Sequence, residues 1–333
     1  MSLYTWGRGK DHRLGHADGA VDHAEPSAVM TLSGLQLAHV ALGNCHGGAV
    51  TATGEVYMWG GGAFGELGLG DSVEEAPRPC LLAALGGHRV VHLSCGFYHT
   101  ACVTADGAVW SWGWGRDGQL GHGEASAVPA CVEALRQQPA AKVACGHHAT
   151  AALGRDGNVY VWGLLGSAED ESGGSGEASR GAIRRAELPE GAARSVDVGG
   201  EHALVCLADG RLFSWGSGRH GQLGFGDLLD RRAPTHVTSL QMASAASCGE
   251  AHSAALAIIS DGSAAAATIR ACVWGRCQYG APGPAASDEG GGTAAGHTVP
   301  RALSLRVPIS SVGRSIGGSQ LISISCGYHH AAC

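Results

Sequence analysis

The chain has 333 residues, of which 44% are hydrophobic and only 15% are charged, a composition that suits a packed core and not a disordered polypeptide. The net charge of −7 lacks the basic excess of a general nucleic-acid binder, and no apolar run is long enough for a membrane span. Twelve cysteines without a CxxC pair, behind an N-terminus that does not resemble a signal peptide, indicate reduced thiols in an intracellular protein, cytoplasmic or nuclear.

A Trp-Gly pair recurs along the chain at nearly constant spacing. The pairs begin at Trp6, Trp59, Trp112, Trp162, Trp215 and Trp274. A G-x-x-H element lies upstream of each pair except the first, and its histidine keeps one fixed separation from the tryptophan at His46, His99 and His202. Before Trp162 the histidine, His148, is one place out of phase and Ala149 stands in the expected position. A fixed period of about 50 residues predicts a repeat architecture.

Within each unit the same elements follow one another. The G-x-x-H element leads into a short apolar segment, then a turn such as "TADG" or "LADG", then an alternating segment that ends in Trp-Gly. Asp-Gly between alternating runs is a strong signal of a β-hairpin. A G-Q-L-G segment follows, and a further extended segment then begins at a proline, as at Pro79, Pro129 and Pro234. Each unit therefore predicts four strands.

Four short antiparallel strands per unit, with no amphipathic helical pattern between them, favour an all-β propeller whose blades bury their apolar faces against one another. The period is too long for the WD type. The glycine doublets do not keep the register that a kelch repeat requires. The cycle of C-G-x-x-H-T, D-G-x-V-x-x-W-G and G-Q-L-G-x-G instead resembles the regulator of chromosome condensation family over nearly the whole chain, which we expect to form a single domain, residues 1–333.

The sequence departs from that family in two places and in the number of units. Polar, glycine-rich insertions at about 164–182 and 276–298 replace the G-Q-L-G segment, and we expect them to project from the ring. The family implies seven blades, whereas six are visible here. The first strand and the C-terminal "HHAAC" are complementary parts of one blade, so we expect pairing of the two ends to close a six-bladed ring; a fragment of a seven-bladed ring is the alternative.

Several segments imitate catalytic or cofactor motifs. "GGGAFG", "GWGRDG" and "GSGRHG" fit G-x-G-x-x-G, but three copies one period apart, none opening a helix, do not form a dinucleotide site. "GRSIG" fits a serine nucleophile motif without the following helix. The Cys-His pairs repeat once per unit and are better explained as a small buried residue and a histidine that forms a hydrogen-bonded strap between turn and strand. We therefore expect no enzyme activity, no cofactor and no metal, including at Cys272 and Cys277.

The two residues inside each G-x-x-H element vary while the frame around them is constant, which is how binding surfaces are built on repeats. We call them the tip residues; they are Asn44 and Cys45, Phe97 and Tyr98, His147 and His148, Gly200 and Glu201, Glu250 and Ala251, and Tyr328 and His329. In the resembled family the tips lie on one ring face, and some members place light-sensing tryptophans there. None of the tips is tryptophan here, which counts against photoreception.

The hypothesis for function is a protein-interaction scaffold. Its mixed aromatic and acidic partner site would comprise Phe97, Tyr98, His147, His148, Glu201, Glu250, Tyr328 and His329. The alternative for any one tip is a variable, solvated residue without a partner. The resemblance implies a small GTPase or a ubiquitin-pathway protein as partner. Guanine-nucleotide exchange on a small GTPase, or a role as the propeller part of a larger ubiquitin ligase, remain open alternatives.

Overall fold

The computed structural model describes residues 2–166, 182–259, 270–276, 297–302, 325–326 and 331–332. These residues form β-strands and four single-turn 3₁₀ segments, η1 (Lys10–His12), η2 (Met30–Leu32), η3 (Ala83–Leu85) and η4 (Glu133–Leu135). No helical segment in these ranges is long and apolar enough to cross a membrane. The expected all-β class is confirmed.

The described strands form five four-stranded antiparallel sheets and two two-stranded sheets, each ordered as in the sequence. The four-stranded sheets are β3 (Leu37–Leu42), β4 (His46–Thr51), β5 (Val56–Gly61) and β6 (Glu75–Leu81); β7 (Val90–Cys95), β8 (His99–Thr104), β9 (Val109–Trp114) and β10 (Ala125–Cys131); β11 (Ala140–Cys145), β12 (Ala149–Gly154), β13 (Val159–Gly163) and β14 (Arg184–Arg185); β15 (Ala193–Val198), β16 (His202–Leu207), β17 (Leu212–Gly216) and β18 (Arg231–His236); and β19 (Leu240–Cys248), β20 (His252–Ile259), β21 (Arg270–Gly275) and β22 (His297–Ala302). The two-stranded sheets are β1 (Tyr4–Gly7) with β2 (His23–Ala28), and β23 (Ser325–Cys326) with β24 (Ala331–Ala332).

The sequence landmarks coincide with strand boundaries. The second strand of four of the complete sheets begins at the landmark histidine, and β12 begins at Ala149, where the pattern is one place out of phase. The third strand carries the Trp-Gly pair. In the hairpin between β8 and β9, Gly107 has a φ of 96°, which a residue with a side chain adopts only with strain. The predicted strand–turn–strand order is therefore confirmed.

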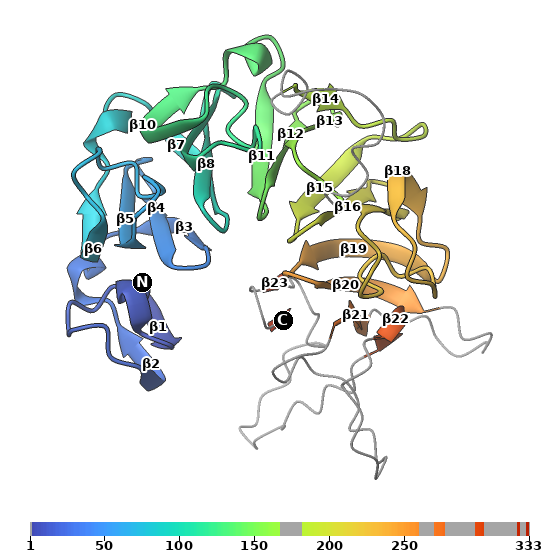
Figure 1. Cartoon of the computed structure of the whole chain (residues 1–333), viewed down its shortest axis with the longest axis horizontal. Coiled ribbons are helices and arrows are strands. Elements are labelled where there is room, and N and C mark those ends of the chain that lie inside the picture. Colours follow the sequence, from blue (N-terminus) through green and yellow to red (C-terminus); the bar gives the residue numbers. More distant parts are fainter. Residues whose placement is uncertain are drawn as a thin grey trace, which may run out of the picture.

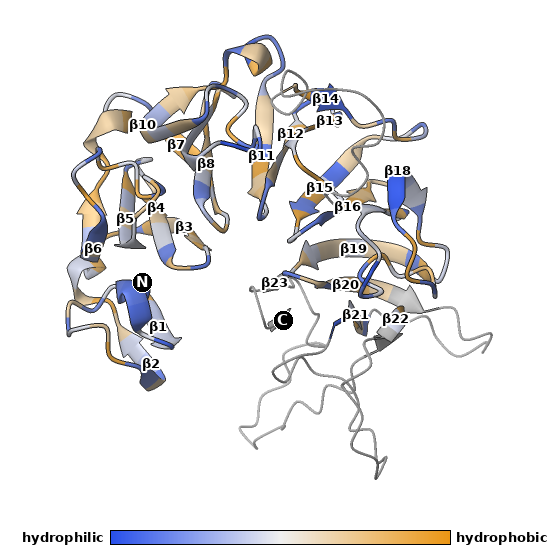
Figure 2. Cartoon of the chain, viewed as in Figure 1, coloured by the Kyte–Doolittle hydropathy of each residue, from blue (hydrophilic) through white to orange (hydrophobic). Residues whose placement is uncertain are grey.

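The sheets follow one another around a partial ring, as in a propeller (Figure 1). The first strands β3, β7, β11, β15 and β19 contact their counterparts in the neighbouring sheets, while the fourth strands lie toward the periphery (Figure 1). The contrast in composition is clearest between the outer strand β18, which is strongly hydrophilic, and the inner strand β19, which is largely hydrophobic (Figure 2).

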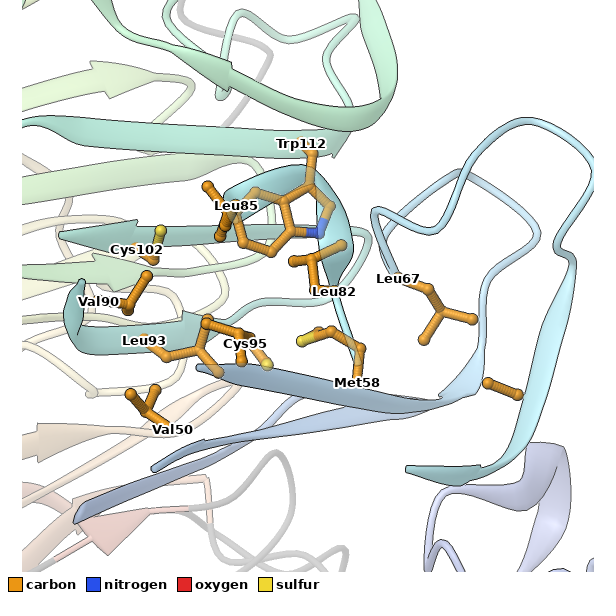
Figure 3. Packing of buried hydrophobic residues seen from close by; sticks show 12 residues of the cluster. Val50, Met58, Leu67, Leu82, Leu85, Val90, Leu93, Cys95, Cys102 and Trp112 are labelled. Carbon is orange, nitrogen blue, oxygen red and sulfur yellow. The ribbon is translucent and has the colours of Figure 1, made fainter. Parts of the chain in front are cut away.

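The apolar core lies between neighbouring sheets. Between the sheets β3–β6 and β7–β10, Met58 and Val50 of one pack against Leu93 and Cys102 of the other, with the indole of Trp112 at one side (Figure 3). The repeated tryptophans Trp59, Trp112, Trp162, Trp215 and Trp274 are at most 6% exposed. Burying an indole in this way removes on the order of 200 Å² of surface from water, so each sheet depends on its neighbour for stability.

The two ends of the chain form separate two-stranded sheets. Among the described residues, β1 pairs with β2 alone and β24 with β23 alone, so ring closure by the two ends remains a prediction. Trp6 on β1 is 59% exposed, unlike its five counterparts, because the described residues place no neighbouring sheet over it. The two expected insertions, 164–182 and 276–298, lie almost entirely outside the described residues.

Candidate functional site

The landmark histidines hold neighbouring sheets together. Nε2 of His46 lies 2.9 Å from the hydroxyl of Thr100 in the next sheet, and His99 and His202 make the same contact with Thr150 and Ser253 at 2.7 and 2.8 Å. Burial lowers the pKa of all three histidines to about 3, so they are neutral near pH 7. They act as straps, as expected, but between sheets and not between a turn and a strand of one unit.

The same hydroxyls reach a shared carbonyl in the G-Q-L-G segment. The Thr100 hydroxyl donates to the Glu66 carbonyl at 2.7 Å, and the Trp112 indole Nε1 donates to the same oxygen at 2.9 Å. Gln119 and Gln222 provide equivalent carbonyls in later repeats. Gly68, two residues after Glu66, has a φ of 71°, and a Cβ there would lie 2.8 Å from the Trp112 indole. These repeated residues are therefore structural.

This frame brings the tips into one continuous line. The backbone N–H of one tip donates to the glycine carbonyl that precedes the next tip, at 3.1 to 3.2 Å, in the pairs Asn44 to Gly96, Phe97 to Gly146, His147 to Gly199, and Gly200 to Gly249. Each tip is consequently fixed against its neighbour. Side chains from successive repeats, which are far apart in the sequence, therefore form one surface.

Along this line five rings form a cluster that we call the aromatic patch: Phe64, Phe97, Tyr98, Trp114 and His147. Ring centroids are 4.0 Å apart for Phe97 and His147, 4.2 Å for Phe97 and Tyr98, 4.7 Å for Phe64 and Tyr98, and 5.1 Å for Phe64 and Trp114. Most of these contacts are edge-to-face, the geometry that aromatic pairs prefer. Phe64 is 40% exposed and the other four are half-buried, so the patch faces solvent.

The edges of the aromatic patch are polar. The His148 ring stacks on His147 at 4.1 Å, and its Nδ1 lies 2.7 Å from a carboxylate oxygen of Asp117. Burial lowers the pKa of His147 to about 4, so this ring is neutral near pH 7. The guanidinium of Arg116 lies 4.8 Å from the centroid of the Trp114 ring, a cation–π contact that holds the half-buried indole in place.

The acidic tips lie farther along the same line. Glu201 and Glu250 occupy the tips of the sheets β15–β18 and β19–β22. Burial, followed by the charge of Arg276, lowers the pKa of nearby His220, and the two carboxylates oppose this shift. Arg276 donates to Nε2 of His220 at 2.8 Å. This sector is charged and adjoins the aromatic patch, because the backbone N–H of His147 donates to the carbonyl of Gly199 in front of the tip that carries Glu201.

Four predicted site residues, Phe97, Tyr98, His147 and His148, are thus brought together, and Glu201 and Glu250 lie in the adjoining charged sector. Tyr328 and His329 lie outside the described residues. Sequence reasoning missed Phe64, Trp114 and Arg116. Their signal was present, because they occupy variable places directly after Trp-Gly, where the third strand returns to the tip end of the sheet.

One group of potential metal ligands occurs in the described residues, at Cys45, His46 and Glu66, with one ligand atom of each within 4.8 Å of the others. It fits a metal poorly. Burial raises the pKa of the Cys45 thiol to about 12 and raises that of the Glu66 carboxyl, which favours the protonated forms, and Thr100 engages Nε2 of His46, so that only Nδ1 of this ring is left as a possible ligand. The Cys45 thiol instead donates to Glu66 at 3.5 Å.

The Cys-His pairs do not have the electrostatics of a nucleophile and its base. Burial raises the pKa of the Cys95 thiol well above its ordinary value and that of Cys145 to about 12, while it lowers that of His99 to about 3. A reactive cysteine needs a lowered thiol pKa. Both thiols are therefore ordinary components of the core.

The model of the RCC1-like domain family matches residues 2–333. The chain belongs to this family. The RCC1-like domain described here is 35% identical over 263 residues to human "E3 ubiquitin-protein ligase HERC2", covering 76% of this chain and 5% of that protein. It is 34% identical over 262 residues to the Arabidopsis thaliana "Ultraviolet-B receptor UVR8", covering 77% of this chain and 58% of the receptor. The chain therefore spans less than two thirds of the length of these relatives.

Solved structures of RCC1-like propellers share the fold. Human WBSCR16 superimposes with a TM-score of 0.75 at 23% identity, covering 97% of this chain and 78% of the other. Yeast RCC1 (Prp20), solved bound to Kap60, superimposes with a TM-score of 0.61 at 18% identity, covering 98% of this chain and 87% of Prp20. At this level of identity the likeness establishes the propeller architecture of the RCC1-like domain.

Proposed function

We propose that this RCC1-like domain is a non-catalytic, intracellular protein-interaction module that binds a protein partner through the ring face formed by the tips. The partner surface comprises the aromatic patch, with the predicted residues Phe97, Tyr98, His147 and His148, and continues into Glu201 and Glu250. Tyr328 and His329 are proposed to extend it, on sequence grounds.

The aromatic patch is the observation that supports this proposal. Residues of three successive sheets place aromatic rings in mutual contact at the surface, outside the cores between sheets. Large rings in a rigid setting lose little conformational entropy on binding and are enriched at the centres of protein interfaces. A mainly apolar contact ringed by Arg116, Asp117 and His148 also matches the usual anatomy of an interface core and its polar rim.

The test is partner capture with the double variant Phe97→Ala plus Tyr98→Ala. A matched control is Leu228→Ala plus Leu229→Ala, which removes two exposed apolar side chains, 54% and 64% exposed, from a loop outside the patch. Quantitative mass spectrometry of captured proteins should show at least tenfold loss of specific partners for the patch variant, about 1.4 kcal/mol or more, and no loss for the control. Equal recovery of the same partners by wild type and the patch variant would refute the proposed surface.

The alternatives make different predictions. Guanine-nucleotide exchange requires faster release of labelled GDP from a small GTPase, and the scaffold proposal predicts no acceleration across a panel of such GTPases. If this domain is part of a ubiquitin ligase, the activity named for HERC2, a ligase domain would be needed in addition to the propeller. Recovery of ubiquitin-pathway proteins by the wild type but not by the patch variant would identify the class of partner, and would not assign catalysis to this domain.

A further inference from the structure

A second candidate site lies at the opposite end of the blade β7–β10 from the aromatic patch. It is a pocket of about 280 Å³ whose lining includes His88, Asp106, Ala108, Trp110, Glu133 and Arg136. Strand β8 starts beside the tip Phe97–Tyr98 and ends at the Asp-Gly turn that carries Asp106, and β9 returns from this turn to Trp114. Six-residue strands separate the two ends by about 20 Å.

The repeat itself indicates what such a pocket holds. In the sheet β15–β18, the equivalent turn carries Asp209, Arg211 and Phe213 where this blade has Asp106, Ala108 and Trp110. Nε of Arg211 donates to Oδ2 of Asp209 at 2.7 Å, and its Cζ lies 5.8 Å from the centroid of the Phe213 ring. A guanidinium thus occupies the space between the carboxylate and the aromatic ring.

The pocket blade has the same two partners without the cation. Ala108 occupies the position equivalent to Arg211. Its backbone N–H donates to Oδ1 of Asp106 at 3.4 Å, and the backbone N–H of Arg211 makes the equivalent hydrogen bond to Oδ1 of Asp209 at 3.0 Å. The turn geometry is therefore preserved while the side chain that would fill the space is absent. In the intervening blade, the Asn158 amide occupies the second oxygen of Asp156.

The charges at the pocket favour a cation. The Thr104 hydroxyl donates to Asp106 and holds the pKa of this carboxyl below its ordinary value, so it is ionised at neutral pH. Within the described part of the chain, Asp106 forms no ion pair. Glu133 lies 3.2 Å from Arg136, but both side chains are more than 60% exposed, so this pair is solvated and weakly held. Among the residues that line the pocket, two carboxylates thus stand against one guanidinium; the guanidinium of Arg155 donates to the neighbouring Ala105 carbonyl at 2.7 Å and is not part of the lining.

We infer that this pocket binds the guanidinium group of an arginine side chain presented by a partner, with Asp106 as the ion-pair partner and the Trp110 ring as the aromatic platform. Tryptophan is the best side chain for a cation–π contact, and guanidinium is the cation that the repeat places in the equivalent position. The His88 ring, whose centroid lies 4.7 Å from that of Trp110, forms part of the pocket wall beside this platform. This site is independent of the proposed function, because it involves other residues on the other face.

The test uses the full chain labelled with ¹⁵N, observed through its indole N–H signals, with N-acetyl-arginine methylamide as probe. Within the described residues, Nε1 of Trp110 is buried without a hydrogen-bond partner, whereas Nε1 of Trp112 and Nε1 of Trp162 each donate a hydrogen bond. The indole N–H signal of Trp110 should therefore be distinct, and its loss in the Trp110→Phe variant would assign it. We expect a saturable shift of this signal with a dissociation constant on the order of 1 mM.

Three variants locate and characterise the site. Ala108→Arg supplies the side chain of Arg211 and should abolish the saturable shift. Asp106→Asn should weaken binding about fivefold, as expected for loss of one ion pair. Asp156→Asn is the matched control, because its carboxylate belongs to the neighbouring turn, and it should leave the affinity unchanged. If Ala108→Arg does not fold, the comparison of the two Asp→Asn variants still decides the location.

Neutral and cationic analogues complete the experiment. The citrulline analogue, which has the same shape without the charge, should bind at least fivefold more weakly than the arginine probe. No saturable shift with the arginine probe, equal affinity for citrulline, or binding that survives Ala108→Arg would overturn the inference. A lysine analogue that binds as tightly as arginine would overturn the assignment of guanidinium as the preferred group.

Discussion

Thr100→Val should destabilise the protein by about 2 to 4 kcal/mol, although the two side chains have nearly the same volume. The Thr100 hydroxyl donates its only hydrogen to the Glu66 carbonyl, so at the 2.9 Å contact it must accept from Nε2–H of His46. Valine leaves that buried donor unpaired, at about 1 to 3 kcal/mol, and removes one net hydrogen bond to the carbonyl, at about 1 kcal/mol. The Glu66 carbonyl keeps the Trp112 indole and adds no further penalty.

Urea unfolding followed by circular dichroism measures this cost. Thr100→Ser keeps the hydroxyl and loses one methyl group, so it should cost only about 1 kcal/mol. In a His46→Leu background the unpaired donor is absent, and Thr100→Val should then cost at least about 1 kcal/mol less than in the wild type. A valine variant as stable as the serine variant, or a cost that is undiminished in the His46→Leu background, would refute this account of the strap.

Two further predictions concern buried titratable groups. Because burial lowers the pKa of His46, His99 and His202 to about 3, the unfolded chain binds protons below about pH 6.5 that the folded chain does not bind. The free energy of unfolding should therefore fall as pH drops below about 6.5, by up to about 1.4 kcal/mol per pH unit for each histidine. Urea unfolding at pH 7.5, 6.5 and 5.5 measures this slope, and His202→Gln should reduce it. Glu66→Gln places at this position the amide found at Gln119. Because burial raises the pKa of the Glu66 carboxyl, the stability of the variant should rise relative to that of wild type as pH increases above 4.5; urea unfolding between pH 4.5 and 7 that shows no change in the variant's favour would contradict this reasoning.

Local chemistry made the architecture predictable. An Asp-Gly turn, an alternating segment and a Trp-Gly ending specify a hairpin within a short stretch of chain, and repetition at a constant period shows that each hairpin serves the same role. The start of β8 at His99 and the place of Trp112 on β9 follow directly from these signals. Ring closure did not follow in the same way, because pairing of the two ends depends on contacts between opposite ends of the sequence.

The sequence by itself also determined which positions vary on a constant frame, and so predicted Phe97, Tyr98, His147 and His148 as surface candidates. Only the tertiary structure decided that Phe64, from the turn after β5, and Trp114, at the end of β9, join them in one aromatic patch. It alone showed that Ala108 leaves Asp106 and Trp110 around a pocket. The physical reason is that a turn and its hairpin form between near neighbours in the chain, whereas side-chain clusters and the hydrogen bonds between sheets depend on how separate sheets pack against one another.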